Sequence, residues 1–177
     1  MGKVISIVNQ KGGVGKTATA VNLSASLAVE GLKTLLVDFD PQSNATSGAG
    51  IDSVKQEESI YAALSGDVPV ERILLPAQPE GLFIAPSCLH LAGAELELVS
   101  LPRRESRLKE ALASQVFLFD YIIIDCPPSL GLLTINALTA SRSVLVPLQC
   151  EYYALEGLTR LLDTVEMVRQ NLNPSLH

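Results

Sequence analysis

Five short stretches of the chain are rich in branched apolar residues. They cover residues 4–8, 34–37, 82–85, 121–124 and 143–148. Continuous hydrophobicity, as opposed to an alternation of apolar and polar positions, is typical of strands buried on both faces of a parallel sheet. The pattern therefore predicts five buried strands.

Two longer segments repeat their apolar residues with helical spacing. Residues 17–30 form one apolar side and are followed by Gly31, a residue that readily adopts the left-handed conformation at a helix end. Residues 153–170 repeat leucine and valine in the same way. Between residues 48 and 86 the periodicity is weak, so only a short helix at residues 60–64 is predicted there.

The alternation of strands and helices defines the fold class. It favours right-handed βαβ units, in which helices cover both faces of a mainly parallel sheet. The predicted class is therefore α/β. The 177 residues contain no repeat and no linker, so we predict a single domain over residues 1–177.

Composition excludes several classes of protein. Hydrophobic residues make up 47% of the chain and charged residues 18%, which excludes an intrinsically disordered chain. The apolar runs are far shorter than the roughly 20 residues that cross a bilayer, and the first residues lack a secretory signal pattern. We therefore expect no membrane span and a cytoplasmic location.

Charge and cysteine content narrow the picture further. A net charge of -6 argues against a strong nucleic-acid surface, because binding to phosphates needs clustered lysine and arginine. One basic cluster is present, but two glutamates interrupt it, which favours a solvated helix face. Its members are Arg103, Arg104, Arg107 and Lys109. The cysteines are widely spaced and odd in number, which favours buried, reduced thiols: Cys88, Cys126 and Cys150.

The most informative segment is glycine-rich and lies between the first predicted strand and the first predicted helix. Glycines let backbone N–H groups turn toward an anion, and the helix N-terminus adds partial positive charge. Lys16, expected to be exposed on this loop, can reach the β- and γ-phosphates of a nucleotide, and the Thr17 hydroxyl can bind Mg²⁺. The predicted phosphate-binding residues are Gly12, Gly13, Val14, Gly15, Lys16 and Thr17.

Aspartates follow two other predicted strands. Asp38 and Asp40 come after the second stretch, and Asp125 follows the stretch at residues 121–124. Ligands of open α/β sheets bind at the carboxyl ends of the strands, so we expect these carboxylates to lie near Lys16. Mg²⁺ commonly needs a carboxylate ligand, directly or through water. One aspartate should therefore serve the metal and another the attacking water.

Four motifs in this order resemble one family. They are KGGVGKT at residues 11–17, DFDPQ at 38–42, DCPPS at 125–129 and QCEYYALEG at 149–157. Together they are similar to the deviant Walker A ATPases of the ParA/Soj chromosome and plasmid partition family, and the match runs from residue 4 to about residue 162. The first motif alone also occurs in MinD-like and nitrogenase-iron-protein-like proteins.

The resemblance implies a P-loop NTPase-like fold and an ATP-driven switch. ATP and Mg²⁺ would form a homodimer, the dimer would bind non-specific DNA, and a ParB-type partner would stimulate hydrolysis. Members of the family continue beyond the position of His177, so we expect this chain to lack the family's C-terminal third, including its DNA-binding residues. The full-length form would be nucleoid-associated.

The resemblance also implies roles for residues of the glycine-rich loop. Lys16 would be the Walker lysine, Thr17 the Mg²⁺ ligand and Lys11 the lysine that reaches the partner subunit's phosphates. Ala18 stands where the family usually has threonine, which leaves only a backbone N–H for the α-phosphate. Glu151 would contact nucleotide across the dimer.

The same resemblance divides the aspartates by role. Asp40 would orient the attacking water, whereas Asp38 and Asp125 would hold the Mg²⁺ shell through water.

Three alternatives remain. A MinD-like membrane recruiter for cell-division site placement would need an amphipathic C-terminal helix. A nucleotide-binding module that no longer hydrolyses ATP would be separated by an ATPase assay. An iron–sulfur reductase would need two suitably placed cluster cysteines, which the positions of Cys126 and Cys150 do not favour.

Overall fold

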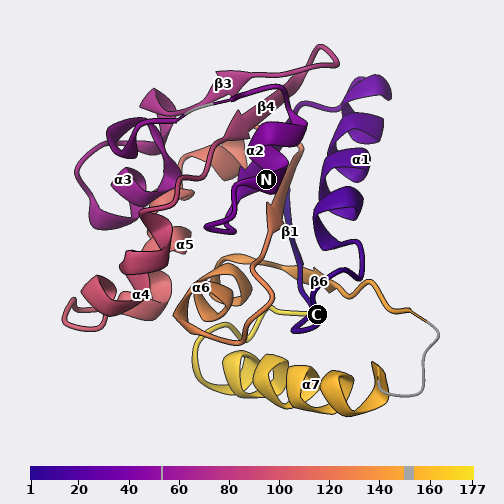
Figure 1. The fold of residues 1–177 in the computed structure, drawn as a ribbon, viewed down its shortest axis with the longest axis vertical. Helices are drawn as coiled ribbons and strands as arrows, with labels where there is room; N and C mark the ends of the chain where they lie inside the picture. Colours follow the sequence, from indigo (N-terminus) through magenta and orange to yellow (C-terminus); the bar gives the residue numbers. More distant parts are fainter. Residues whose placement is uncertain (53, 150–153) are drawn as a thin grey trace.

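The computed structural model describes residues 1–52, 54–149 and 154–177. Its described strands form one six-stranded sheet in the order β3-β4-β2-β5-β1-β6 (Figure 1). All neighbouring strands in it are parallel except β3, which runs antiparallel to β4. The strands are β1 (Lys3–Ile7), β2 (Thr34–Asp38), β3 (Leu75–Pro76), β4 (Leu82–Ala85), β5 (Tyr121–Asp125) and β6 (Ser143–Leu145).

The described α-helices cover both faces of this sheet. They are α1 (Lys16–Val29), α2 (Asn44–Gly48), α3 (Ile60–Ser65), α4 (Leu91–Leu98), α5 (Arg107–Ala111), α6 (Leu132–Ala140) and α7 (Ala154–Asn171). Short 3-10 turns lie at Gln56–Glu58, Val70–Arg72, Arg104–Ser106 and Gln115–Phe117. The predicted α/β class, with a mainly parallel sheet between helices, is confirmed.

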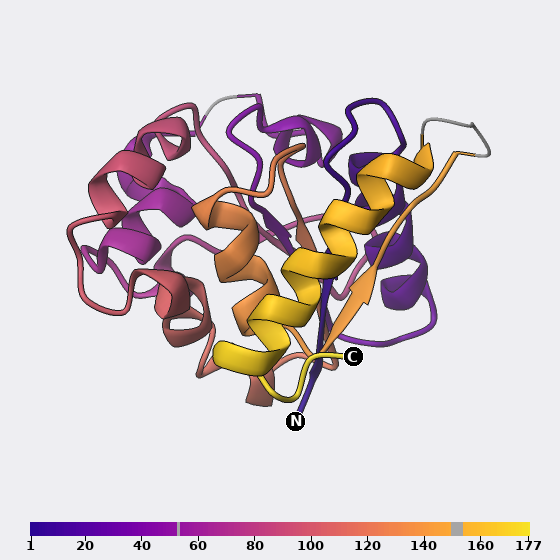
Figure 2. The same ribbon diagram turned by 90° about the horizontal axis from the view of Figure 1, so that it is seen from below.

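Alternation along the strands divides the interior into two hydrophobic cores. In β5, Ile122 and Ile124 point into the core under α3 to α7, whereas Ile123 points into the core under α1. Figure 1 shows α1 on one side of the sheet and α3, α4 and α5 on the other. Figure 2 shows α6 and α7 side by side, and Asn173 after α7 donates to Leu138 O of α6 at 3.0 Å. A strand buried on both faces needs apolar residues at every position, which explains the continuous runs.

The predicted elements agree closely with the observed ones where the signal was continuous or strongly periodic. The first and last long helices begin and end within one residue of their predicted bounds, and the short helix at residues 60–64 is α3. The last strand is shorter than predicted, because β6 ends at Leu145. Four helices were missed: α2, α4, α5 and α6. Helix α6 is apolar on most sides and largely buried, so it has no polar face to mark its period.

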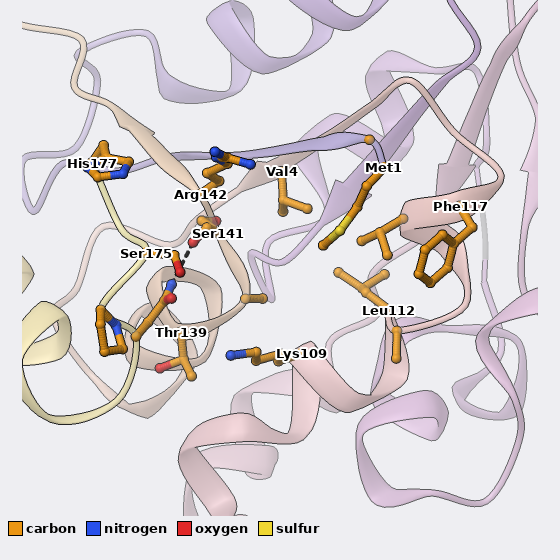
Figure 3. A pocket seen from close by; sticks show the side chains of 16 residues that line it. Met1, Val4, Lys109, Leu112, Phe117, Thr139, Ser141, Arg142, Ser175 and His177 are labelled. Atoms are coloured by element: carbon orange, nitrogen blue, oxygen red, sulfur yellow. Dashed lines mark hydrogen bonds between the residues drawn. The ribbon is translucent and has the colours of Figure 1, made fainter.

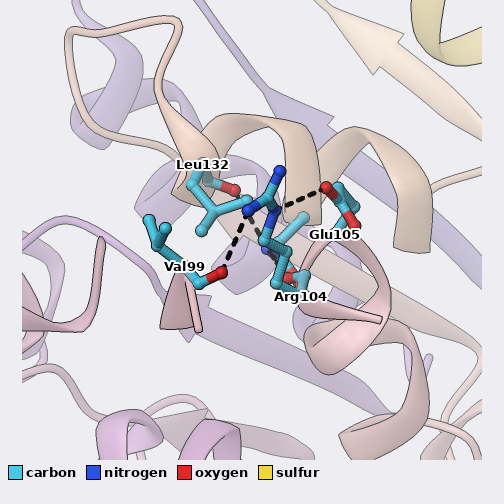
Figure 4. A network of polar contacts seen from close by, with 5 residues as sticks. Val99, Arg104, Glu105 and Leu132 are labelled. Carbon is cyan, nitrogen blue, oxygen red and sulfur yellow. Dashed lines mark hydrogen bonds and ion pairs between the residues drawn. The ribbon is translucent and has the colours of Figure 1, made fainter. Parts of the chain in front are cut away.

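The interpretation of the basic cluster as a solvated helix face is wrong for Arg107, which is partly buried. Arg107 donates to the carbonyls of Leu64 at 2.9 Å and Ser65 at 2.8 Å, at the end of α3. Arg104 donates to Val99 O at 2.9 Å and forms an ion pair with Glu105 (Figure 4). Arg107 thus binds backbone carbonyls more than 40 residues away, which the local sequence does not reveal, whereas both of these partners of Arg104 are local.

A cavity of about 650 Å³ lies at the amino end of the sheet, beside residues 1–4 of the chain (Figure 3). Val4, Leu112 and Phe117 form an apolar wall, and Lys109 and Arg142 add two charged side chains. Ligands of open α/β sheets bind at the opposite, carboxyl end of the strands. None of the described helices combines the length and the hydropathy of a membrane span.

Candidate functional site

Three predicted loops meet at the carboxyl end of the sheet. Strand β5 lies between β1 and β2, and its last residue, Asp125, is in register with Ile7 on one side and Asp38 on the other. Phe39 N donates to Asp125 O at 2.9 Å, which extends the pairing beyond β2. The register of the parallel sheet therefore places the glycine-rich loop after β1 next to both groups of aspartates.

The glycine-rich loop has the backbone that its composition predicts. Gly13 and Gly15 have φ angles of 75° and 87°, which L side chains rarely adopt. A Cβ atom added at Gly12, Gly13 or Gly15 would meet nothing within 4 Å, so these glycines are not required by packing. Val14 is buried and Ala18 is exposed in the first turn of α1. Open space therefore lies beside these glycines at the start of a 14-residue helix, where an anion is favoured.

Side chains outside the predicted set brace this loop. The Asn9 side chain accepts from Lys11 N at 2.9 Å and donates to Pro147 O at 2.8 Å. Gln149 Nε2 donates to Gly13 O at 3.2 Å. Sequence reasoning missed Asn9, and nothing in its local sequence indicates that its two contacts lie more than 130 residues apart.

Gln10 occupies the position where an ordinary P-loop has glycine. Its Nε2 donates to Gly157 O in α7 at 2.8 Å, and a Cβ at Gly157 would approach that nitrogen to 2.8 Å. The departure from the ordinary motif therefore has a structural counterpart, a bond between the glycine-rich loop and the last helix.

Lys16 lies inside the site and is only 7% exposed, so the expectation of an exposed loop lysine is wrong. Its Nζ donates to Lys11 O at 3.0 Å. Burial lowers the pKa of Lys16, while the negative charges of Asp125 and Asp40 act in the opposite direction. These charge interactions show that Lys16, Asp40 and Asp125 lie together, as expected from the sequence.

Asp125 is the most unusual group of the site. Both of its carboxylate oxygens are buried, and neither has a hydrogen-bond partner among the residues that the structure describes. Burial raises the pKa of Asp125 to about 7; the charges of Asp38 and Asp40 act in the same direction, and the nearby Thr17 hydroxyl and Lys16 oppose it. A buried carboxylate without a hydrogen-bond partner is costly and therefore rare, so the Asp125 oxygens are suited to binding a cation.

Asp38 has the same register position but different surroundings. One oxygen accepts from Asp40 N at 3.2 Å, and the other accepts from both the amide and the hydroxyl of Thr46 at 2.7 Å. Burial still raises the pKa of Asp38 to about 6, against the effect of these hydrogen bonds. Asp40 accepts from Gln42 N at 2.9 Å. Sequence reasoning missed Thr46. Only its position eight residues after Asp38 could have pointed to it.

The residues present fit a nucleotide with Mg²⁺. In the described part of the chain, no three or more His, Cys, Asp or Glu side chains form a metal-binding cluster. Mg²⁺ is usually held by one or two carboxylates together with waters and substrate phosphates, so such a cluster is not needed. The Thr17 hydroxyl and the orphaned oxygens of Asp125 are hard oxygen ligands of the required kind.

The remaining sequence predictions differ in what the structure describes. Lys11 is exposed on the glycine-rich loop. Glu151 and Cys150 lie outside the described residues. Cys88 and Cys126 are buried and free, as predicted, and burial raises the pKa of the Cys126 thiol well above its ordinary value. A fully buried thiol of this kind is inert, which does not favour a cluster ligand.

Together these features define the class of protein. A glycine-rich loop lies between the first strand and a long helix, a lysine and a threonine begin that helix, and aspartates end the neighbouring parallel strands. This is the arrangement of a P-loop NTPase.

Comparison with known proteins identifies the family. The AAA domain family matches residues 2–177. The sporulation initiation inhibitor protein Soj of Bacillus subtilis is 58% identical over 176 residues, which cover 99% of this chain and 70% of Soj. The chromosome partitioning protein ParA of Myxococcus xanthus is 56% identical, and the match covers 99% of this chain and 62% of ParA. The chain therefore belongs to the ParA/Soj family of chromosome-partitioning ATPases.

A solved structure supports the same fold. A protein from Mycobacterium smegmatis described as cobyrinic acid a,c-diamide synthase, with a bound ATP analogue and magnesium, superimposes with a TM-score of 0.95. It is 45% identical, and the match covers 99% of this chain and 72% of that protein. The P-loop NTPase fold predicted from the sequence is thereby confirmed.

Proposed function

We propose that this protein is an ATP-binding and ATP-hydrolysing partition protein, a switch that segregates DNA. The observation that supports it most is the orphaned carboxylate of Asp125 beside Lys16 and Thr17, next to an open glycine-rich loop. Such a site needs both an anion for the loop and a cation for the carboxylate. A nucleotide with Mg²⁺ provides both, and the chain is 58% identical to Soj of Bacillus subtilis and 56% identical to ParA of Myxococcus xanthus.

The chain's own residues would bind and orient the nucleotide. Backbone N–H groups of the glycine-rich loop and the start of α1 would hold the phosphates, and Lys16 would place its charge on the β- and γ-phosphates. Thr17 and Asp125 would hold Mg²⁺, which when bound neutralises charge on the phosphate oxygens. Asp40, whose charge acts on Lys16, would orient the attacking water.

Asp38 has a different place in this proposal. We predicted that it holds the Mg²⁺ shell through water, and that role stays a prediction. Both of its oxygens already accept hydrogen bonds from Asp40 and Thr46, which favours a role in holding the loop.

The switch itself would depend on dimerisation. ATP would bring two copies face to face, and Lys11, exposed on the loop, would reach the phosphates bound by the partner subunit. Glu151 would contact nucleotide across the same interface. A ParB-type protein would stimulate hydrolysis, and non-specific DNA would bind through residues beyond this chain. The net charge of -6 agrees with placing the DNA surface elsewhere.

Two variants separate binding, chemistry and assembly. Asp40→Ala should bind Mg-ATP with wild-type affinity, hydrolyse it at least about tenfold more slowly and accumulate as a dimer. Lys11→Ala should bind ATP as a monomer and fail to dimerise. Calorimetry, phosphate release and size exclusion with and without ATP measure these properties, and Lys55→Ala, far along the chain in a surface ion pair, is the control. Hydrolysis at the wild-type rate by Asp40→Ala would refute the assignment of the water-orienting residue.

A further inference from the structure

A buried hydroxyl connects two loops at the carboxyl end of the sheet. Thr46, in α2, is 2% exposed, and its Oγ1 lies 2.7 Å from an Asp38 oxygen and 3.0 Å from Ser87 N. Ser87 follows β4 and is 1% exposed. Thr46 therefore joins the loop after β2 to the loop after β4, although 41 residues separate Thr46 from Ser87.

The direction of each hydrogen bond in this group is determined by the atoms involved. A threonine hydroxyl has one proton and can also accept. The amide of Ser87 can only donate, so Thr46 Oγ1 accepts from it and donates its own proton to Asp38. The proton of the Thr46 hydroxyl and one of its two lone pairs then each have a defined partner, which fixes the direction of both hydrogen bonds.

The same group holds both ends of the Asp40 backbone. Asp40 N donates to Asp38 Oδ1 at 3.2 Å, while Asp40 O accepts from Ser87 Oγ at 2.7 Å and from Ser43 N at 2.9 Å. Thr46 donates to the same Asp38 carboxylate that accepts the hydrogen bond from the Asp40 amide. The backbone of Asp40, which lies beyond the end of β2, is thus held by the side chains of Asp38 and Ser87.

We propose that Thr46 and Ser87 are positioning residues that hold Asp40 where it orients the attacking water. This rests on the proposed function, in which Asp40 acts in ATP hydrolysis. A small displacement of an orienting group lowers the rate of the chemical step with little effect on binding. The phosphates are bound by the opposite half of the site, so loss of either hydroxyl should affect kcat and leave KM almost unchanged.

Four variants test the proposal. Thr46→Val and Ser87→Ala should lower kcat by about tenfold and change KM for Mg-ATP by less than about twofold. Thr46→Ser restores the hydroxyl and should return kcat to within about threefold of the wild type. Thr34→Val is the matched control, because Thr34 is buried at the other end of β2 and its hydroxyl donates to Leu32 O at 2.9 Å; its kcat should stay at the wild-type value.

Hydrogen exchange gives a second measurement that does not depend on activity. In Thr46→Val, Ser87 N and Asp38 each lose a partner, so amide exchange in peptides covering residues 38–47 and 86–89 should rise by at least about tenfold. Exchange in α1 should stay unchanged. Any one of three results for Thr46→Val would overturn the proposal. These are a wild-type kcat, a KM raised in proportion to the loss of kcat, and unchanged amide exchange in both loops. If the wild-type chain hydrolyses no ATP, the proposed function fails, and exchange still decides whether Thr46 holds the Asp40 loop.

Discussion

Asp38 and Asp125 end neighbouring parallel strands in register, yet they differ in what surrounds them. The half of the site on β1 and β5 contains an aspartate whose two oxygens have no partner among the described residues. The half on β2 and β4 contains an aspartate that accepts three hydrogen bonds from its own chain. The same residue type at the same register position therefore has no hydrogen-bond partner among the described residues in one half and holds the protein's own loop in the other.

The physical reason for this difference is the number of donors that each loop provides. After β2 the chain turns back, so that the amide and hydroxyl of Thr46 and the amide of Asp40 point at Asp38. The Thr17 hydroxyl is close enough to Asp125 to lower its pKa, but within the described residues neither oxygen of Asp125 has a partner with hydrogen-bond geometry. A buried polar group without a partner costs about 1–3 kcal/mol, and a charged one costs more. Burial of the Asp125 carboxylate is thus costly in the β5 half, whereas in the β2 half both oxygens of Asp38 accept hydrogen bonds.

The largest expected effect is the loss of nucleotide binding on removal of Lys16. Lys16→Ala deletes a charged donor of the β1 half and should weaken ATP binding by at least about 100-fold. The chain should still fold, because the lysine nitrogen donates a hydrogen bond to Lys11 O on the loop and does not support the hydrophobic core. Calorimetry with ATP and Mg²⁺ measures the affinity, and Lys55→Ala serves as the exposed control. Near-normal affinity in Lys16→Ala would end the assignment of this loop to phosphate.

The second-largest expected effect is on stability, and it tests whether the buried Asp125 carboxylate destabilises the ligand-free protein. Its pKa is about 7 in the folded protein and near 3.8 in the unfolded chain, so the folded state binds the proton more tightly. Stability from this group is therefore highest below about pH 4, is lost as the pH rises toward 7, and stays low above it. Asp125→Asn removes the charge and should stabilise the ligand-free protein by about 2–4 kcal/mol at pH 8, and by less at pH 5.

Thermal unfolding in EDTA at pH 5 and pH 8 measures this difference. With Mg-ATP present the wild type should be more stable than Asp125→Asn, because the wild-type carboxylate then binds its cation and the side-chain amide of the variant does not. A ligand-free Asp125→Asn protein that is less stable than the wild type at pH 8 would show that the carboxylate already has a partner.

In the β2 half, the corresponding aspartate-to-asparagine substitution is expected to lower stability, not raise it. In Asp38→Asn the amide nitrogen must face either Asp40 N or the donors of Thr46, so a hydrogen bond is replaced by two opposed donors. The variant should lose about 1–3 kcal/mol of stability. Denaturant unfolding without nucleotide is the measurement. If Asp38→Asn and Asp125→Asn changed the free energy of unfolding in the same direction, the two halves of the site would not differ as described.

The smallest effect concerns the brace between the glycine-rich loop and α7. Gln10→Ala removes the hydrogen bond to Gly157 O and should cost about 0.5–1.5 kcal/mol, with ATP affinity changed by only a fewfold. Denaturant unfolding and calorimetry would measure both. An ATP affinity reduced as much as in Lys16→Ala would mean that the loop needs α7 to take its shape.

Much of the fold could be predicted from the sequence, because its signals are local. Strands β1, β2, β4 and β5 are buried on both faces and so appear as continuous apolar runs, and α1 shows a clear period. Helix α6 is buried on most sides, so its sequence lacks a polar face, and it was missed. Arg107 looked like a surface residue because its acceptors, Leu64 O and Ser65 O, lie more than 40 residues away.

The sequence by itself determined the chemistry available at the site, because glycine, lysine, threonine and aspartate can be read directly at the ends of predicted strands. Only the tertiary structure decided which of these groups are already satisfied. Asp38 and Asp125 look alike in sequence, and the difference between them depends on donors brought by the turn at α2 and on the register of β5 between its neighbours. Whether a buried oxygen has a hydrogen-bond partner depends on where the folded chain directs its donors, even when these lie only two to eight residues away, and the residue types alone do not show it.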